Sequence, residues 1–412
     1  MDQDLARVAR RLMERLDALT AFTDDPPRLT RLFLSPAHRR AAAQYIAWAR
    51  EAGLEARIDP VGNIRARYEG REAGAKALMI GSHIDTVRDA GRYDGALGAL
   101  AALAVVETLA ARGRRLDVAI EIVAFGDEEG VRFPRTMTGS RALAGVNEPS
   151  ALEQKDAAGV RMRDALIAFG GAPDRLAAAR ADGVAAFVEL HIEQGPVLEA
   201  EGRPLGVVNA INGATRLSAI VYGAAGHAGA SPMNLRHDAL AAAAEMILAI
   251  ETRARAEIER DLVATVGRLD VEGGAVNVIP GKVRFSIDVR SPRDEWRRRA
   301  VAEMAAAMEA IAARRGVAVE LTPTHEAAAY ACDLKIIAGF EAAVASLGLE
   351  PRVLPSGAGH DTMIMGQRWP AGMLFVRCKG GVSHNPAESI SGEDCAIALA
   401  ALTRFVEDFR AP

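Results

Sequence analysis

The chain has 412 residues, of which 50% are apolar and 25% are charged, and its formal net charge is −4. This composition is typical of a soluble globular protein, and so small a charge gives no reason to expect nucleic acid or a membrane surface as a partner. No apolar run approaches the roughly 18 residues that span a bilayer, and the length suggests two or three domains.

The predicted elements of the first half alternate strands with helices. Residues 1–19 predict an amphipathic helix rather than a signal peptide, because apolar side chains recur at helical spacing between charges. Buried strands are expected at 77–80 and 118–125, with a helix over 96–112 between them, and further strands at 185–193 and 205–210. This order predicts an α/β fold whose mixed, mainly parallel sheet is sandwiched by helices.

The pattern changes from about residue 213. Strands are expected at 217–222 and 282–290, and long helices at 236–259 and 293–315. The strand at 282–290 alternates strictly, so one of its faces packs on helices and the other points outward. Residues 213–328 therefore predict an inserted two-layer α+β unit.

The last part of the chain returns to the first pattern. It predicts a helix at 334–347, a strand at 373–377 and a closing helix at 393–409. We therefore expect one domain to be made of residues 1–212 and 329–412.

An acidic triplet follows the strand at 118–125. Asp127, Glu128 and Glu129 lie between two glycines. Carboxylates are rarely buried unless they are paired or bind a cation, and neighbouring like charges raise one another's pKa. Such a cluster usually binds metal or transfers protons.

Histidines and further carboxylates also follow strands. They are His83, Asp94, His191 and His384. An open α/β sheet places its binding crevice at these strand ends. A period of two puts Asp85 on the same side as His83, where its carboxylate is expected to accept the second ring N–H of a metal-bound imidazole.

Any one such residue at a strand end is more often structural or solvated than functional. Together they match the mixed nitrogen and oxygen ligands of a catalytic site for zinc or manganese. The carboxylates are too many for one tetrahedral ion. Two ions that share a bridging carboxylate are the simpler solution, with Asp94 as the bridge because its glycine-flanked turn directs it along the crevice.

Eight segments in series carry a resemblance to a known family. They are Gly81–Val87 (GSHIDTV), Gly91–Gly98 (GRYDGALG), Asp127–Phe133 (DEEGVRF), Glu189–Pro196 (ELHIEQGP), Gly226–Gly229 (GHAG), Asn277–Pro280 (NVIP), Ser356–Asp361 (SGAGHD) and Ser383–Glu388 (SHNPAE). They resemble the amidase, hydantoinase/carbamoylase family of the dinuclear M20-type metallopeptidase superfamily. That family includes N-carbamoyl-L-amino acid hydrolases, β-ureidopropionases and allantoate amidohydrolases, and the match runs from about residue 10 to 405.

The resemblance implies the fold of the zinc aminopeptidases and two divalent ions per subunit, either Zn, Mn, Co or Ni. One ion would be held by His83, Asp94 and His191, and the other by Asp94, Glu129 and His384. Glu128 would be the general base that takes a proton from a metal-bridging water, and this role requires a raised pKa. Asp85 is expected among the catalytic residues, and Asp127 has no assigned role.

The resemblance also implies that residues 213–328 form a lid that makes a homodimer. His227 and Asn277 would reach the active site of the partner subunit and stabilise the oxyanion, so His227 counts as both catalytic and substrate-binding. Arg290 would hold the substrate carboxylate as a bidentate fork.

Weaker expectations concern Gln194, Gly357, Gly359 and His360, which would contact the substrate or support the ligands. His38, His237 and His325 match no motif, and we expect them to be ordinary surface or packing residues.

We therefore expect a hydrolase of non-peptide C–N bonds. It would cleave the carbamoyl bond of N-carbamoyl amino acids, or of ureido acids such as β-ureidopropionate and allantoate, which are small molecules that carry a carboxylate. His191 stands where many peptidases of the superfamily use a carboxylate, which favours ureido and amide substrates over peptides. An aminoacylase or dipeptidase is the alternative.

Two other classes are less well supported by the residues. A catalytically silent binding protein should have lost some ligand or the base, and all are present. A thiol amidase needs a cysteine in a motif with a histidine, and none of the three cysteines lies in one. Because these cysteines form no CxxC motif, we expect reduced, buried thiols and a cytoplasmic location.

Overall fold

The computed structural model describes residues 3–411, which divide into two compact units. Unit 1 contains the described residues up to Asn209, then Cys332–Leu354, and then those from Ala358 onward. Unit 2 contains Ala210–Ala331 and Pro355–Gly357. No helix among the described residues combines the length and hydropathy that crossing a membrane requires. The first two residues of the helix expected at 1–19 lie outside the described residues.

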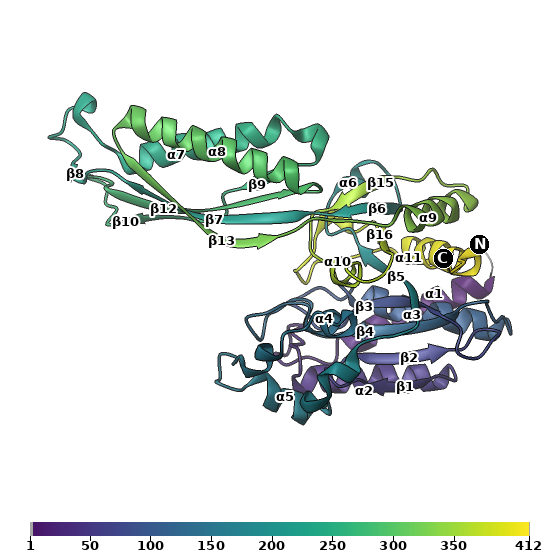
Figure 1. Ribbon diagram of the computed structural model, residues 1–412. Coiled ribbons are helices and arrows are strands. Elements are labelled where there is room, and N and C mark those ends of the chain that lie inside the picture. The colour runs from purple at the N-terminus through teal and green to yellow at the C-terminus, as the bar shows by residue number, and fades with distance from the viewer. Residues whose placement is uncertain (1–2, 412) are drawn as a thin grey trace. The chain divides into compact units, whose positions relative to one another are not determined.

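A mixed sheet forms the centre of unit 1 (Figure 1). In spatial order its strands are β1 (Glu55–Ile58), β2 (Ile64–Tyr68), β4 (Ala119–Phe125), β3 (Ala77–His83), β5 (Val184–Ile192), β16 (Ala371–Val376) and β6 (Leu205–Ile211). The four strands from β4 to β16 run parallel, and those outside them pair antiparallel. The prediction of a mainly parallel sheet in an α/β fold is therefore confirmed. Shorter strands β15 (Val353–Ser356) and β14 (Tyr330–Ala331) also pair with β6.

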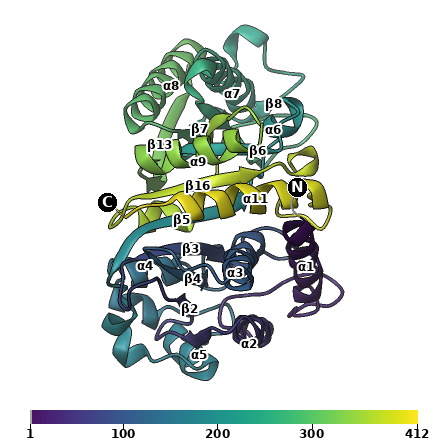
Figure 2. The same ribbon diagram turned by 90° about the vertical axis from the view of Figure 1, so that its right-hand side faces the viewer.

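Helices cover both faces of this sheet. Figure 2 looks onto the face that carries α1 (Gln3–Leu19), α2 (Pro36–Glu51), α3 (Ala96–Ala111), α9 (Leu334–Ser346) and α11 (Gly392–Asp408). The other face carries α4 (Thr138–Ala144) and α10 (Asp361–Met365), and the remaining short helices of the unit are α5 (Met162–Phe169) and α6 (Val197–Ala200). Helix α3 is buried along almost its whole length, as its continuous run of alanine, leucine and valine predicts. The rings of Phe340 and Phe405 stack with centroids 4.1 Å apart and join α9 to α11.

Unit 2 has two layers. Its antiparallel sheet contains β10 (Leu269–Glu272), β12 (Lys282–Ser291), β7 (Gly213–Tyr222) and β13 (Ala318–Ala327), and β9 (Val263–Thr265) also pairs with β12. Helices α7 (Ala239–Arg255) and α8 (Asp294–Arg315) cover one face (Figure 1). In β12 the side chains at 283, 285, 287 and 289 are buried under these helices, and the alternate ones point outward, as the alternation predicts. The role of this unit as a lid and dimerisation domain stays a prediction.

Helix α7 is shorter than the 236–259 that its alanine-rich sequence predicts. It begins after Asp238, because the carboxylate of this residue accepts the backbone N–H groups of Leu240 and Ala241 and caps the helix. A separate 3-10 turn, Ile258–Arg260, follows its end.

The expectation that the three cysteines are buried free thiols agrees with the structure.

Candidate metal centre

The carboxyl ends of the parallel strands bring the candidate ligands together. His83 is the last residue of β3, and His191 lies at the end of β5. Glu129 follows β4, His384 follows β16, and Asp94 occupies the turn before α3. Segments far apart in the sequence thus meet at one edge of the unit 1 sheet, where parallel strands place a binding crevice.

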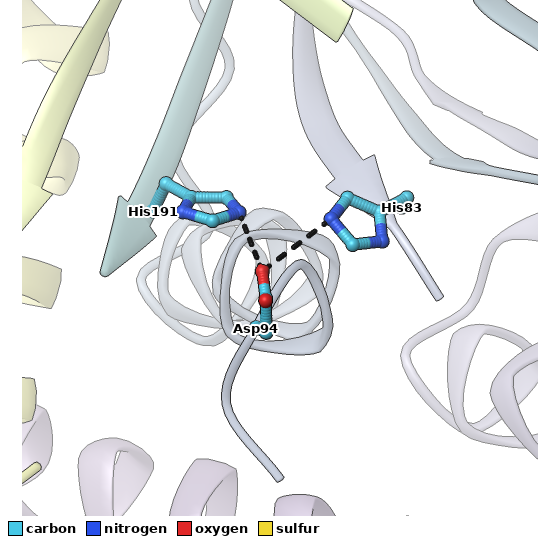
Figure 3. A group of neighbouring side chains, drawn as sticks. All are labelled: His83, Asp94 and His191. Atoms are coloured by element: carbon cyan, nitrogen blue, oxygen red, sulfur yellow. Dashed lines mark ion pairs between the residues drawn. The ribbon is translucent and has the colours of Figure 1, made fainter. Parts of the chain in front are cut away.

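Asp94 lies at the centre of this group (Figure 3). Its Oδ1 is 3.1 Å from Nε2 of His191 and 3.6 Å from Nε2 of His83. Its Oδ2 is 3.1 Å from Nε2 of His384. The two carboxylate oxygens therefore face different histidines, as a carboxylate between two cations does.

Glu129 completes the second half of this arrangement. Its Oε1 lies 3.6 Å from Nε2 of His384 and, among the described residues, has no hydrogen-bond partner although it is buried. Burial, together with the charge of Asp94, raises the pKa of Glu129 to about 7. A buried carboxylate oxygen without a partner is costly unless a cation or a proton satisfies it.

Four three-residue groups of the described residues have ligand atoms close enough to hold an ion, and two of these four are the expected ligand sets. These two are His83, Asp94 and His191, and Asp94, Glu129 and His384. In both groups the ligand atoms lie within 4.8 Å of one another. Imidazole nitrogens mixed with carboxylate oxygens suit zinc and similar divalent metals, so the residues fit such ions.

Backbone carbonyls orient the two buried histidines. Nδ1 of His83 lies 3.0 Å from the carbonyl oxygen of Asp85, and Nδ1 of His191 lies 2.9 Å from that of Ile192. Each ring therefore donates its Nδ1–H and turns Nε2, the atom that can bind a metal, toward Asp94. In His191 this Nε2 also accepts the backbone N–H of Gly95 at 3.3 Å.

The expected hydrogen bond from His83 to the carboxylate of Asp85 is wrong. That carboxylate lies 3.9 Å from Nδ1, and its two oxygens instead accept the backbone N–H groups of Glu128 and Glu129 at 3.2 and 3.3 Å. The period-two rule fails here because β3 ends at His83, so Asp85 belongs to the following loop. Asp85 thus anchors the acidic segment that carries the two glutamates.

Glu128 points to the same centre. Its Oε2 lies 4.0 Å from Nε2 of His83, and only 10% of its side chain is exposed. Burial raises the pKa of Glu128 well above its usual value, and the charge of Glu129 raises it further, while His83 opposes the shift. A buried carboxylate with a raised pKa is suited to proton transfer.

Asp127 has a different environment from its two neighbours. The hydroxyl of Thr138 donates to its Oδ2, and its Oδ1 has no partner among the described residues. Burial and then the charge of Asp85 raise the pKa of Asp127 well above its usual value. Its backbone is left-handed with φ of 68°, as are those of Gln194 (59°) and His384 (55°). Such strain in non-glycine residues is concentrated at functional sites.

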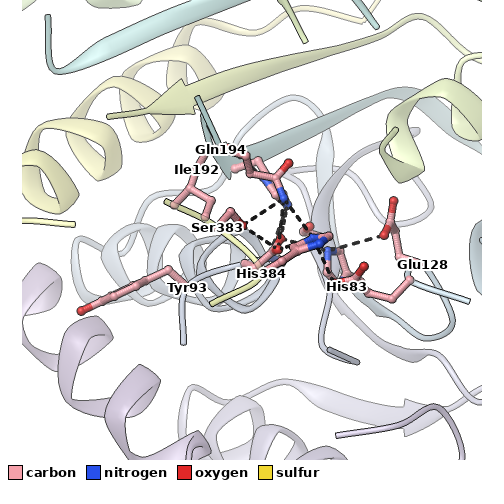
Figure 4. Close-up of polar contacts among 12 residues, drawn as sticks. His83, Tyr93, Glu128, Ile192, Gln194, Ser383 and His384 are labelled. Atoms are coloured by element: carbon pink, nitrogen blue, oxygen red, sulfur yellow. Dashed lines mark hydrogen bonds and ion pairs between the residues drawn. The ribbon is translucent and has the colours of Figure 1, made fainter. Parts of the chain in front are cut away.

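Glu388 and Ser383, for which the sequence predicts no individual role, lie beside Asp94 together with Gln194. Oε1 of Glu388 accepts the backbone N–H groups of Tyr93 at 2.8 Å and Asp94 at 3.1 Å. The hydroxyl of Ser383 lies 3.1 Å from Oδ2 of Asp94 and 3.0 Å from Oε2 of Glu388. Gln194, expected as a substrate contact, donates from Nε2 to the same Oδ2 at 3.0 Å (Figure 4). The only signal for Ser383 and Glu388 in the sequence was that both lie in the motif of His384.

His360 lies beside the centre in unit 1, and Gly359 precedes it in the chain. The buried ring of His360 meets that of His191 with centroids 4.5 Å apart. Burial, and then the charge of His191, hold the pKa of His360 well below its usual value. Gly359 is close to the side chains of Met137 and Met363, which a Cβ at this position would meet at 3.2 and 3.7 Å.

The other candidate substrate residues belong to unit 2 and are described within it. His227 and Asn277 lie on adjacent segments joined by β8 (Gly226–His227) and β11 (Val278–Ile279), and the N–H of Ala228 donates to the carbonyl of Asn277 at 2.9 Å. Arg290 lies on the outward face of β12 and donates to the carbonyl of Gly357 at 2.8 Å. The roles of all these residues stay predictions.

A sequence profile of peptidase family M20/M25/M40 matches residues 79–408. The chain belongs to this family. It is 43% identical to an N-carbamoyl-L-amino acid amidohydrolase of Geobacillus stearothermophilus over 395 residues, which cover 95% of this chain and 96% of that protein. It is 42% identical to a probable allantoate deiminase of Oryza sativa subsp. japonica over 95% of this chain and 87% of that protein.

A solved structure agrees with these sequence relatives. The crystal structure of an amidase of the hydantoinase/carbamoylase family from Burkholderia multivorans superposes with a TM-score of 0.92 at 32% identity and covers 96% of each chain. The predicted resemblance to this family is therefore confirmed, and so is the prediction of an enzyme that hydrolyses C–N bonds.

Proposed function

We propose that this M20-family enzyme is a binuclear metal-dependent amidohydrolase that cleaves the carbamoyl C–N bond of N-carbamoyl amino acids or related ureido acids. The observation that carries the binuclear part is the position of Asp94, whose two carboxylate oxygens face separate histidines. In this proposal His83 and His191 hold one divalent ion with Asp94, and Glu129 and His384 hold the other.

Two divalent ions in these positions would polarise the substrate carbonyl and lower the pKa of the attacking water. Glu128 takes the proton of that water and returns it to the departing nitrogen, which requires a carboxylate with a pKa near the working pH. Its burial beside His83 supports this role. Asp85 fixes the segment of Glu128 by accepting its backbone N–H.

The substrate class is inferred from the relatives. N-carbamoyl amino acids and allantoate, which the names of two relatives specify, are small molecules in which a ureido group lies near a carboxylate. In this proposal Arg290 binds that carboxylate. His227 and Asn277 of one subunit of a homodimer stabilise the developing oxyanion in the active site of the other subunit. Gly357, Gly359 and His360 would line the site.

A substrate panel tests this proposal. It contains N-carbamoyl-L-amino acids, N-carbamoyl-β-alanine, allantoate and N-acetyl amino acids, with release of ammonia or free amino acid as the signal. We expect turnover of one or more ureido compounds, and a preference for the acetyl compounds would favour an aminoacylase instead.

Metal removal provides the second test. Treatment with a chelator should abolish activity, and addition of Zn, Mn, Co or Ni should restore it. Activity that survives complete removal of metal, checked by elemental analysis, would contradict a metal-dependent mechanism.

A further inference from the structure

Arg290 is fixed by a neighbour on its own strand. The outward face of β12 places Asp288 two residues before it, so both side chains point the same way. Nε and Nη2 of Arg290 donate to the two oxygens of Asp288 at 2.8 and 3.0 Å. This is a bidentate, charge-assisted pair, which fixes the plane of the guanidinium as well as its position.

The hydrogen bonds of Arg290 leave one pair of donors for a ligand. A guanidinium has five N–H groups, and three are used: two by Asp288 and one, on Nη1, by the carbonyl of Gly357. Within the described part of the chain the other two have no partner, and they lie one on each terminal nitrogen. Arginine commonly binds the two oxygens of a carboxylate through one N–H on each of two nitrogens.

A second arginine shares the charge of Asp288. Nε of Arg216, on the neighbouring strand β7, donates to Oδ2 of Asp288 at 2.9 Å. Partial burial alone would raise the pKa of Asp288. The hydrogen bonds from Arg290 and Arg216 outweigh this effect and hold the pKa of Asp288 below its usual value. Two arginines and one aspartate leave one net positive charge, so Asp288 orients Arg290 without cancelling the attraction for an anion.

We propose that Asp288 is a positioning residue that holds Arg290 with its two remaining N–H groups directed at the substrate carboxylate, and that Arg216 supports it. This inference rests on the proposed function of Arg290. The alternative to a positioning role is that the carboxylate of Asp288 competes with the substrate carboxylate for Arg290. The two ideas predict opposite signs for the loss of the Asp288 charge, because a competitor weakens binding whereas a positioning residue strengthens it.

The test compares KM and kcat for two substrates, the best N-carbamoyl amino acid of the panel and its C-terminal amide. Asp288→Ala should raise KM for the carboxylate substrate about 10- to 100-fold, the range that one charge-assisted pair is worth, with kcat changed less than about threefold. Asp288→Asn keeps the shape of the side chain and one hydrogen-bond acceptor. The KM of this variant for the carboxylate substrate should therefore lie between the values for the wild type and for Asp288→Ala. KM for the amide should change less than about twofold in both variants.

A matched control exists on the same face of the sheet. Asp270 pairs with Arg268, also two residues away, at 2.7 Å, and both side chains are more exposed than Asp288 and Arg290. Asp270→Ala should leave both KM values unchanged. Circular dichroism and metal content of the variants should equal those of the wild type.

Three outcomes decide the question. A KM for the carboxylate that stays unchanged or falls in Asp288→Ala overturns the positioning role. An equal rise of KM for the carboxylate and the amide also overturns it. If Arg290→Ala itself leaves the ratio of the two KM values unchanged, the proposed function of Arg290 has failed, and the inference about Asp288 fails with it.

Discussion

Glu388 accepts the backbone N–H of Asp94 at 3.1 Å, although the two residues are 294 positions apart in the chain. The same carboxylate oxygen accepts the N–H of Tyr93, and the other oxygen meets the hydroxyl of Ser383 next to His384. One side chain thus connects the turn that contains Asp94 to the loop that contains His384. Such partners of metal ligands contribute strongly to affinity.

Glu388→Ala should therefore weaken metal binding about 10- to 100-fold. The measurement is competition with a chelator of known affinity, read by the metal that stays on the protein. Asp333→Ala is the control, because Asp333 also accepts two backbone N–H groups but only caps α9. It should lower stability by about 1 kcal/mol and leave the metal content unchanged. Equal metal affinity in Glu388→Ala and the wild type would show that the turn of Asp94 needs no such support.

Gly95→Ala should disturb the site by steric contact. Gly95 has φ of 63°, and a Cβ there would lie 2.4 Å from the ring of His83, so the ring must move. Gly113→Ala is the matched control, since Gly113 has φ of 59° but open space around it. Both variants should lose about 1 kcal/mol of stability from the strained backbone, and only Gly95→Ala should also lose metal. Retention of two ions by Gly95→Ala would contradict the position of His83 as a ligand.

The positions of the candidate ligands follow from the sequence because simple rules control them. Apolar runs mark the buried strands, and the carboxyl ends of parallel strands converge, so His83, His191 and His384 were expected at one edge. The outward direction of Arg290 follows in the same way from the strict alternation of its strand.

Contacts made beyond the ends of strands could not be predicted. The period-two rule applies to Asp85 only if β3 continues past His83, and the chain turns there instead. The contact of Glu388 with Asp94 depends on how two distant loops meet, which no local pattern encodes. The hydrogen-bond partners of Arg290 likewise depend on side-chain conformations, although Asp288 is visible two residues away.

Glu128→Gln should abolish turnover but not metal binding. The amide keeps the shape of the side chain, yet it cannot accept the proton that the proposed base must take, so kcat should fall by a factor of about 100 to 10,000. Elemental analysis should still find two ions per chain, because in the proposal Glu129 rather than Glu128 is a ligand. Full activity in this variant would contradict Glu128 as the base, and loss of metal would indicate that it is a ligand.

His38 should make the protein less stable in mild acid. The ring is buried, with 1% exposed, and its Nδ1 accepts the N–H of Leu34 at 3.0 Å. Burial, and then the charges of Arg31 and Arg132, lower the pKa of His38 to about 3 from its ordinary 6.5. Between these values the unfolded chain binds a proton that the folded protein does not.

The contribution of His38 to stability is therefore complete above pH 6.5 and is lost as the pH falls toward 3, by about 1.4 kcal/mol per pH unit. His38→Gln keeps an acceptor for Leu34 but has no such proton. Urea unfolding of both proteins at pH 7.5 and 5 should show that the wild type loses about 2 kcal/mol more than the variant on acidification. Parallel losses in the two proteins would mean that His38 is protonated in the folded state at pH 5, which its burial between two arginines should prevent.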